Sequence, residues 1–294
     1  MPPAPPSPSP RSRRSPGPPP APARPALIDT LTELPRAGLE ATRLAWSGSR
    51  LRRRLPPGDG HPVLVLPAYG TGDLGMLPLR RFLARLGYAV FASELGINLD
   101  RGELRIRRIE DAARFRRAQS ERVAARARAI QRETGRRTSL IGWSMGGLFA
   151  FDAARLAPDS VRRVVTLGAP FGDPRGTALW NVMRRLNGSA TPVEEQDFDA
   201  WLDPAPTGAT CPVTIVFSPR DGIVGAEAAR LALASAAIRY EPVASSHLGF
   251  AVNPAAYHAV ARALARDGDA SRGARRDPPQ SSQRPSGGGS TSGS

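Results

Sequence analysis

The sequence of 294 residues contains no lysine, so all 41 residues counted as Lys or Arg are arginines. Against 26 acidic residues they give a formal net charge of +15. The densest stretch, residues 104–137, holds twelve arginines and four acids but only one aromatic residue, Phe115. Nucleic-acid binding favours interleaved aromatic residues or a known docking motif. We therefore interpret this stretch as a solvated helix face, expect no nucleic-acid partner, and keep weak association with an acidic membrane surface as a hypothesis.

Cysteine and long apolar runs are scarce as well. The single cysteine, Cys211, excludes an internal disulfide. No stretch approaches the roughly 20 apolar residues of a membrane span, and no apolar segment of a secretory signal follows the N-terminal arginines. We therefore expect a cytoplasmic protein. The sequence also lacks a cluster of metal ligands and a cofactor motif, so we expect neither a metal nor a cofactor.

Apolar residues make up 40% of the chain, which is too many for disorder throughout. The two ends nevertheless have little to bury. Residues 1–25 are mostly Pro, Ala, Ser and Arg, and residues 267–294 end in a Gly/Ser tail. Neither end has enough apolar surface to bury, so ordering either tail would cost more conformational entropy than burial could offset. We predict disordered tails at both ends of a single domain at 26–266.

Within this domain, short apolar runs alternate with segments of helical spacing. The run at 63–66 is apolar at every position, which is typical of a strand covered on both faces of a parallel sheet. Further strands are predicted at 88–92, 138–142, 163–167, 213–217 and 238–243. Helices are predicted at 27–44 with a break at Pro35, and at 76–86, 107–133, 145–157, 225–235 and 254–266. The alternation predicts an α/β fold: a doubly wound, mostly parallel sheet of about six strands with helices on both faces.

The connection between the strands at 163–167 and 213–217 is much longer than the dozen or so residues that a crossover needs. Long connections with apolar content are usually lids or binding loops. We predict a lid-like insertion at about 173–210 that lines the site for an apolar substrate. The alternative is an extra helix that caps the sheet edge. The candidate substrate-binding residues are its large apolar side chains, Trp180, Met183, Phe198 and Trp201.

The strand at 138–142 runs into the sequence Gly-Trp-Ser-Met-Gly at 142–146, and a predicted helix follows. Gly-x-Ser-x-Gly between a strand and a helix is the pattern of a nucleophile elbow. Such a turn lifts the serine hydroxyl clear of the sheet, and the glycines leave room for backbone that passes close by. The serine also lies at a helix N-terminus, which favours a developing anion. Ser144 is therefore the candidate nucleophile.

A serine hydroxyl needs a base, and the chain has only three histidines. His61 precedes the first strand, whereas active sites of open α/β sheets lie at the carboxyl ends of the strands. His258 falls on a polar face of the last predicted helix. His247 follows the strand at 238–243 and is downstream of Ser144, as the chain order serine, acid, histidine requires. Elimination favours His247 as the base.

The acid that orients the base is expected at the end of the preceding strand. Asp221 lies four residues past the strand at 213–217, although its Asp-Gly pair would also suit a simple turn. Asp173, after the strand at 163–167, is the alternative acid. The chain order favours Asp221, which completes a predicted triad of Ser144, Asp221 and His247.

Five segments of the domain together resemble the α/β-hydrolase superfamily, and within it the lipase/esterase-like branch. They are residues 63–73, 139–148, 167–171, 217–224 and 245–249. The resemblance implies a sheet of eight strands from which this chain lacks the first two. It also implies an oxyanion hole made by the backbone N–H groups of Met145 and Tyr69, with Pro67-Ala68 where many relatives have His-Gly.

The resemblance further implies a serine hydrolase that cleaves carboxylic esters through an acyl-enzyme on Ser144. The expected substrate is an apolar ester or acyl group. Two alternatives remain from the sequence. One is an acyltransferase with the same triad, because the Ser-Met-Gly-Gly elbow also occurs in acyltransferases of the superfamily. The other is a non-catalytic binder of lipid surfaces or nucleic acid on a hydrolase scaffold.

Overall fold

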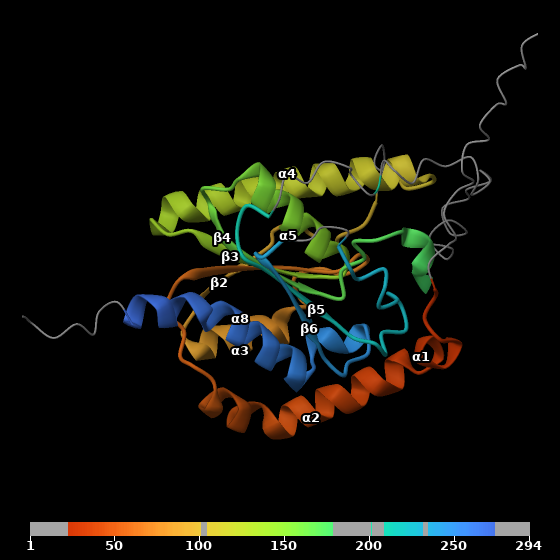
Figure 1. The fold of residues 1–294 in the computed structure, drawn as a ribbon, viewed down its shortest axis with the longest axis horizontal. Helices are drawn as coiled ribbons and strands as arrows, with labels where there is room; N and C mark the ends of the chain where they lie inside the picture. Colours follow the sequence, from red (N-terminus) through yellow and green to blue (C-terminus); the bar gives the residue numbers. More distant parts are fainter. Residues whose placement is uncertain (1–22, 101–104, 179–200, 202–208, 232–234, 274–294) are drawn as a thin grey trace, which may run out of the picture.

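The computed structural model describes residues 23–100, 105–178, 201, 209–231 and 235–273, with side chains as far as residue 266. A sheet lies between two layers of helices (Figure 1). In chain order the principal elements are α1 (Leu27–Leu31), α2 (Glu33–Arg54), β1 (Pro62–Leu66), α3 (Leu77–Leu86), β2 (Ala89–Ala92), α4 (Ile109–Thr134), β3 (Thr138–Trp143), α5 (Met145–Leu156), β4 (Val161–Leu167), β5 (Val213–Phe217), β6 (Ile238–Pro242) and α8 (Pro254–Gly273).

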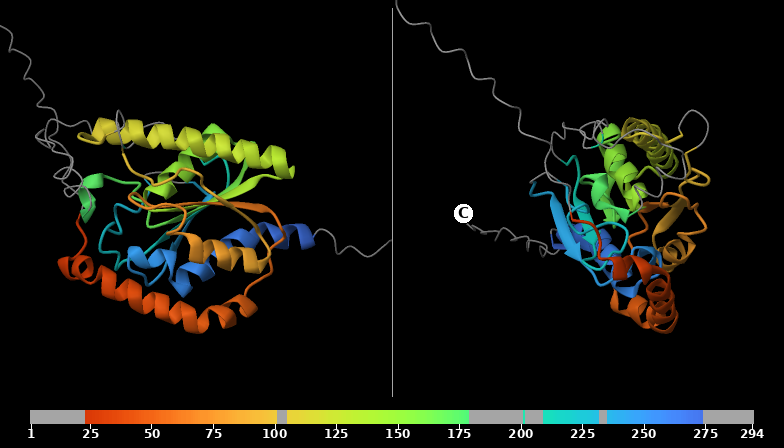
Figure 2. Two further views of the ribbon diagram at one scale, coloured as in Figure 1. Left: turned by 180° about the vertical axis from the view of Figure 1, so that it is seen from behind. Right: turned by 90° about the vertical axis from the view of Figure 1, so that its right-hand side faces the viewer.

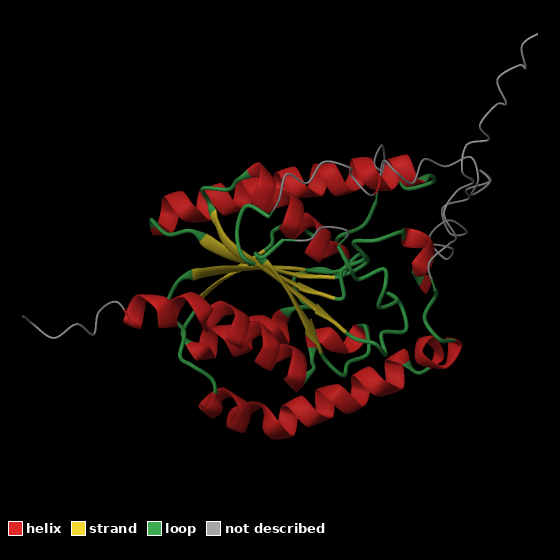
Figure 3. Ribbon diagram, viewed as in Figure 1, coloured by secondary structure: helices red, strands yellow, loops and turns green. Residues whose placement is uncertain are grey.

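The described strands are all parallel and lie in the order β2-β1-β3-β4-β5-β6. Helices α4 and α5 cover one face of the sheet, and α2, α3 and α8 lie on the other (Figure 3). Along β1, Leu64 and Leu66 enter the first core, whereas Val63 and Val65 enter the second. This period of two explains why the strand is apolar at every position. The predicted doubly wound parallel sheet is confirmed.

The centre of the sheet is the point where the chain changes direction. β1 and β3 are neighbours, and the chain leaves them toward opposite edges of the sheet. The loop after β1 leads to α3 on one face, and β3 leads directly to α5 on the other. Ligands of open α/β sheets bind at such a switch point, outside the carboxyl ends of the strands. Ser144 stands at this point.

The helix predicted at 225–235 is wrong over residues 225–231, because residues 226–229 form turns and Arg230 a bend; residues 232–234 lie outside the described residues. The carbonyl of Ala228 accepts a hydrogen bond from the N–H of Gly172 at 2.8 Å. The neighbouring loop thus takes a backbone group that a continuing helix would use. Helical spacing in a sequence cannot show this competition.

The break predicted at Pro35 lies at Thr32 instead, between α1 and α2. Pro35 stands in the first turn of α2, where the missing N–H would have no helical acceptor. At the other end of the chain, α8 continues to Gly273, past the predicted end of the domain at residue 266.

Within the arginine-rich stretch at 104–137, the residues Ile109–Thr134 form α4, and the arginines of this helix are mostly exposed, as a solvated face requires. Arg116 differs, because it is 9% exposed. Its guanidinium binds both carboxylate oxygens of Asp152 in α5 at 2.6 and 2.8 Å. This pair joins the two helices of one layer, so the interpretation as a solvated face is wrong for Arg116.

The predicted insertion at 173–210 lies mostly outside the described residues. Its first part forms a short 3-10 helix at Pro174–Gly176. Of the helices that the structure describes, none has a stretch long and apolar enough to cross a membrane.

Candidate active site

Ser144 lies in the turn between β3 and α5 and has a strained backbone, with φ of 54° and ψ of −124°. The flanking glycines make this turn possible. A Cβ atom at Gly142 would overlap the carbonyl of Gly146, and a Cβ atom at Gly146 would lie 2.6 Å from the carbonyl oxygen of Pro67. The sequence therefore adopts the backbone geometry of a nucleophile elbow.

Hydrogen bonds on both sides hold this turn in place. The N–H of Ser144 donates to the carbonyl of Leu167 in β4 at 2.8 Å, and the N–H of Gly147 donates to the carbonyl of Ser144 at 2.9 Å. Met145 is the first residue of α5, so its N–H has no acceptor within the helix. The positive end of the helix dipole thus begins beside Ser144, where it would stabilise a negatively charged oxygen.

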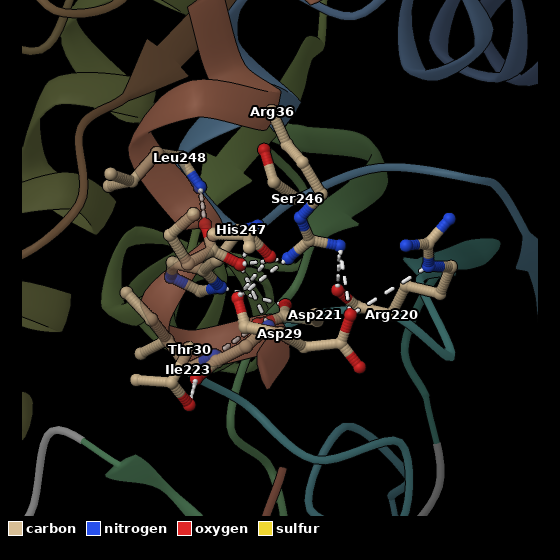
Figure 4. A network of polar contacts seen from close by, with 12 residues as sticks. Asp29, Thr30, Arg36, Arg220, Asp221, Ile223, Ser246, His247 and Leu248 are labelled. Atoms are coloured by element: carbon tan, nitrogen blue, oxygen red, sulfur yellow. Dashed lines mark hydrogen bonds and ion pairs between the residues drawn. The ribbon is translucent and has the colours of Figure 1, made fainter. Parts of the chain in front are cut away.

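Asp221 and His247 are brought together by the loops that follow β5 and β6. Nδ1 of His247 lies 2.7 Å from Oδ2 of Asp221, and both side chains are buried. Oδ1 of Asp221 accepts the backbone N–H groups of Ile223 at 2.9 Å and Val224 at 2.7 Å (Figure 4). The backbone thus fixes the carboxylate with its second oxygen on the imidazole.

The loop of His247 also meets the end of β3. Nε1 of Trp143 donates to the carbonyl of His247 at 3.0 Å. Ser144 and His247 therefore lie at the same edge of the sheet. No hydrogen bond between these two described residues joins Oγ of Ser144 to the imidazole. Such bonds are often long in the absence of substrate and tighten in the complex.

Burial and neighbouring carboxylates together set the charge of His247. Burial favours the neutral imidazole and lowers its pKa. The charge and hydrogen bond of Asp221, with the charge of Glu33, outweigh burial and raise the pKa of His247 above the ordinary value of 6.5. The site therefore favours the imidazolium that forms when His247 accepts a proton.

Glu33, in the first turn of α2, is a site residue that the sequence interpretation missed. Its buried carboxylate accepts three backbone N–H groups: from Gly222 at 2.8 Å, from His247 at 2.9 Å and from Leu248 at 3.0 Å. Gly222 follows Asp221, and the other two residues belong to the loop of His247. One carboxylate thus joins the loop of the acid to the loop of the base.

Glu40, two helical turns further along α2, holds the same histidine loop. Oε1 accepts the N–H of Ser246 at 2.8 Å, and Oε2 accepts the hydroxyl of Ser246 at 3.2 Å and that of Ser245 at 3.3 Å. Like Glu33, Glu40 is buried. Two neighbouring carboxylates therefore hold the backbone on both sides of the peptide bond between Ser246 and His247.

Further contacts from α1 and α2 reach the loop of Asp221. Oγ1 of Thr30 donates to the carbonyl of Gly222 at 2.6 Å, and Arg36 donates to the carbonyl of Arg220 at 2.7 Å (Figure 4). Arg36 also pairs with Glu33 at 3.0 Å and with Asp29 at 3.3 Å. The first two helices thus form a frame for the acid and the base.

A signal for this frame was present in the sequence. Glu33 and Glu40 are seven residues apart and share one helix face with Leu44 and Leu51. Both leucines pack against the core on that side of the sheet. Acids on the inward face of a helix need buried polar partners, because an unpaired buried carboxylate is costly. The spacing could have indicated inward carboxylates, but not which loops they bind.

Tyr69, the predicted second oxyanion donor, is half-buried in the loop after β1. Asn98 holds this loop: its carbonyl accepts the N–H of Gly70 at 2.7 Å, and its side chain donates to the carbonyl of Pro67 at 3.2 Å. Since the carbonyl of Pro67 lies against Gly146, the loop passes directly beside the elbow.

The alternative acid, Asp173, does not meet His247. Its carboxylate accepts the N–H of Arg175 at 2.8 Å and pairs with the guanidinium of the same residue. His258 is exposed on α8. Neither side chain has a hydrogen bond or ion pair with Asp221 or His247 among the described residues.

His61 belongs to a second group of serine, histidine and aspartate at the amino end of the sheet. Nε2 of His61 lies 2.8 Å from Oγ of Ser139, and Nδ1 contacts Asp59. Ser139 is fully buried within the regular strand β3, so no substrate carbonyl can approach its hydroxyl. The group has the residue types of a triad without an elbow or access.

Three of the four predicted substrate-binding residues, Trp180, Met183 and Phe198, lie outside the described residues. Trp201 is described and buried, and its indole N–H donates to the carbonyl of Gly172 at 3.2 Å. Over the ranges that the structure describes, no group of three or more His, Cys, Asp or Glu side chains is arranged to hold a metal ion.

One family model and several solved structures are similar to this chain. Residues 106–203 match a family model described as the alpha/beta hydrolase fold. A protein from Xanthomonas campestris pv. campestris, described as a hydrolase of the alpha/beta superfamily, is 22% identical, with 71% of this chain and 99% of that chain covered and a TM-score of 0.45. Monoacylglycerol lipase from Paleococcus ferrophilus is 16% identical, with 72% and 96% covered and a TM-score of 0.47.

Lipase B from Aspergillus fumigatus is 18% identical, with 70% of this chain and 55% of that chain covered and a TM-score of 0.45. A search of curated protein sequences gave no match.

Proposed function

The chain has the α/β-hydrolase fold, and on that premise we propose that it is a serine-dependent hydrolase of carboxylic esters. One observation carries the proposal. A serine with strained elbow geometry stands at the same edge of the sheet as a buried acid–base pair whose nitrogen and oxygen atoms are 2.7 Å apart. An elbow serine, a base and an orienting acid are the parts that acyl transfer requires.

In the proposed reaction, Oγ of Ser144 attacks the ester carbonyl while Nε2 of His247 takes the hydroxyl proton. Asp221 holds Nδ1–H of the imidazole, which fixes the tautomer and stabilises the imidazolium. The N–H groups of Met145 and Tyr69 stabilise the oxyanion of the tetrahedral intermediate. As the carbon–oxygen bond of the ester breaks, the imidazolium gives its proton to the leaving alcohol.

Water then completes the cycle. His247 takes a proton from the water, whose oxygen attacks the carbonyl of the acyl-enzyme. The second tetrahedral intermediate collapses, the carboxylic acid leaves, and Oγ of Ser144 recovers its proton from the imidazolium. The products are one alcohol and one carboxylic acid, and the protein returns to its starting state.

The test is labelling with a fluorophosphonate, together with turnover of p-nitrophenyl esters. Ser144→Ala is expected to abolish labelling and to lower ester turnover by roughly three orders of magnitude or more, with the fold intact. Ser139→Ala is the matched control, because Ser139 also contacts a histidine but is enclosed in β3. Labelling that persists in Ser144→Ala, or turnover equal to that of the parent chain, would contradict the proposal.

A further inference from the structure

The outer side of α1 and α2 carries a concentration of exposed apolar side chains. Their exposed fractions run from 59% at Leu39 to 84% at Trp46. Single exposed leucines are ordinary, but six large apolar side chains exposed on two consecutive helices are not, and such a concentration favours an interaction site. We call this group the α1–α2 surface; it consists of Leu27, Ile28, Leu31, Leu34, Leu39 and Trp46.

Helix α2 has carboxylates on its buried side and several large apolar side chains on its exposed side, which is the reverse of the usual arrangement. Glu33 and Glu40 are the buried residues of α2. Of its large apolar residues, Leu44 and Leu51 pack against the core, whereas Leu34, Leu39 and Trp46 are exposed. The inward carboxylates bind the loops of the acid and the base. Nothing in the described fold uses the outward apolar side chains. In Figures 1 and 2, α1 and α2 are the outermost elements on their side of the sheet.

The charge on this outer side is entirely positive. All three acids between residues 27 and 55 point inward or are paired, with Asp29 bound to Arg36 and the two glutamates buried. Five arginines of α2 are exposed, and none of them pairs with a carboxylate of the described residues: Arg43, Arg50, Arg52, Arg53 and Arg54. A helix with Leu and Trp beside arginines, and no exposed acid, suits the boundary between lipid headgroups and acyl chains.

We propose that the α1–α2 surface docks on a lipid surface that contains anionic headgroups. The apolar side chains enter the boundary of the acyl chains, and the arginines bind the phosphates. A second copy of the chain fits less well. A symmetric dimer through this surface would bring two sets of unpaired arginines together. The anionic lipid supplies the complementary charge that a second copy lacks.

Docking would also orient the candidate active site. Thr30 of α1 and Arg36 of α2 bind the loop of Asp221, and Glu33 binds the loop of His247. The helices that contact the lipid are therefore the ones that frame the acid and the base. The proposal itself does not rest on ester hydrolysis, since binding is measured without substrate.

The test is co-sedimentation of the full chain with vesicles of phosphatidylcholine alone, and of phosphatidylcholine with phosphatidylglycerol. Binding is expected only to the anionic vesicles and is expected to weaken as salt rises. The emission of Trp46 should shift to the blue on binding. Trp46→Phe should remove most of that shift and still sediment with the vesicles.

Two sets of variants separate the apolar contribution from the charge. The triple variant Leu34→Ser, Leu39→Ser, Trp46→Ser should lower the partition coefficient more than about tenfold. The double variant Arg50→Gln, Arg53→Gln should lower it roughly 25-fold, from about fivefold for each arginine near the surface. Because these side chains are exposed, both variants should keep the circular dichroism spectrum of the parent chain.

Matched controls lie on the other layer of the molecule. Leu156→Ser removes an exposed leucine of α5, and Arg117→Gln with Arg132→Gln removes two exposed arginines of α4. These controls should bind the anionic vesicles as the parent chain does, and Ser144→Ala should do so as well. Unchanged binding in Ser144→Ala keeps the docking proposal separate from the proposed reaction.

Three results would overturn the proposal. The first is a parent chain that does not sediment with anionic vesicles. The second is a loss of binding in the α4 variant equal to that in the Arg50/Arg53 variant, which would assign binding to general positive charge. The third is a dimer in buffer that the triple variant converts to a monomer, which would assign the surface to a second copy. If the triple variant does not fold, the arginine variant still decides the matter.

Discussion

At the residue scale, the two candidate acids differ in what their carboxylates touch. Asp221 holds His247 with one oxygen, whereas Asp173 binds Arg175. Asp221→Asn should lower kcat by about three to four orders of magnitude, because an amide favours the wrong imidazole tautomer. Asp173→Asn should leave kcat near that of the parent chain, because it removes a partly exposed ion pair of small worth.

The measurement is ester turnover at saturating substrate for both variants, with melting temperatures recorded alongside. A larger loss of kcat in Asp173→Asn than in Asp221→Asn would show that the reaction uses the acid after β4. Equal and small losses of kcat in both variants would show that neither carboxylate is needed to orient His247.

The pH dependence of the reaction follows from the raised pKa of His247. A base accepts a proton only when it is neutral, so kcat/KM should rise with pH through the pKa of the free protein. Since that pKa lies above 6.5, the midpoint of the acid limb should also lie above 6.5. A profile of kcat/KM with its midpoint below 6.5 would contradict the assignment of His247.

At the element scale, α2 is predicted to affect the reaction without touching the substrate. Glu33→Gln keeps the size of the side chain but replaces one acceptor oxygen by a donor, and it removes the negative charge near His247. The acid limb of kcat/KM should therefore move to lower pH. The loosened loops should lower kcat by about 10- to 100-fold.

The groups that act on His247 in this comparison are known from the structure. They are Asp221 and Glu33, with Arg36, Asp29 and Arg220 behind them. The matched control is Glu121→Gln on α4, which removes an exposed carboxylate from the other layer. A merely structural role for Glu33 would lower stability and kcat and leave the acid limb in place, and that result would contradict this prediction.

The same helix shows how far sequence can predict an element. Helical spacing could have indicated the inward face of α2, but the partners of Glu33 and Glu40 lie about 200 residues away in the chain. The wrong helix at 225–235 has the same cause, because a carbonyl in that stretch is taken by Gly172. The spacing of residues along the sequence predicts contacts within one helix or strand. The partners of Glu33 and Glu40 and the missing helix over residues 225–231 depend instead on contacts between elements that are far apart in the chain.

At the scale of the whole molecule, the sheet was predictable because both of its faces are covered. The continuous apolar run of β1 admits few other interpretations. Because the strands are parallel, the loops that carry Ser144, Asp221 and His247 leave the sheet at the same edge. The frame made by α1 and α2 was not predictable in this way. It depends on buried hydrogen bonds rather than on the burial of apolar surface.

The molecule has two buried histidines at opposite edges of the sheet, and their pKa values shift in opposite directions. Burial lowers the pKa of His61, and Arg162 and Arg136 add to this against the opposing effect of Asp59. The pKa of His247 is raised. Both histidines have an ordinary value of 6.5 in the unfolded chain, so each one makes stability depend on pH in its own window.

In the unfolded chain, His61 binds a proton as the pH falls below 6.5, whereas in the folded chain it binds that proton only at a lower pH. The free energy of unfolding should therefore fall as pH falls from 6.5 through the lowered pKa. For His247, the folded chain binds its proton more tightly, so the stabilisation is fully present below pH 6.5 and is lost as pH rises through the raised pKa. His61 therefore makes the stability depend on pH below 6.5, and His247 makes it depend on pH above 6.5.

Urea unfolding across a pH series of the parent chain, His61→Asn and His247→Asn separates the two effects. The pKa of Asp59 also depends on His61, but it is lowered and lies far below 6.5. Differences in slope near pH 6.5 therefore report on each histidine. His61→Asn should lessen the loss of stability on acidification below pH 6.5, and His247→Asn should lessen the loss above it. Slopes that stay the same as those of the parent chain, or that change on the opposite sides of pH 6.5, would contradict this description of the two edges.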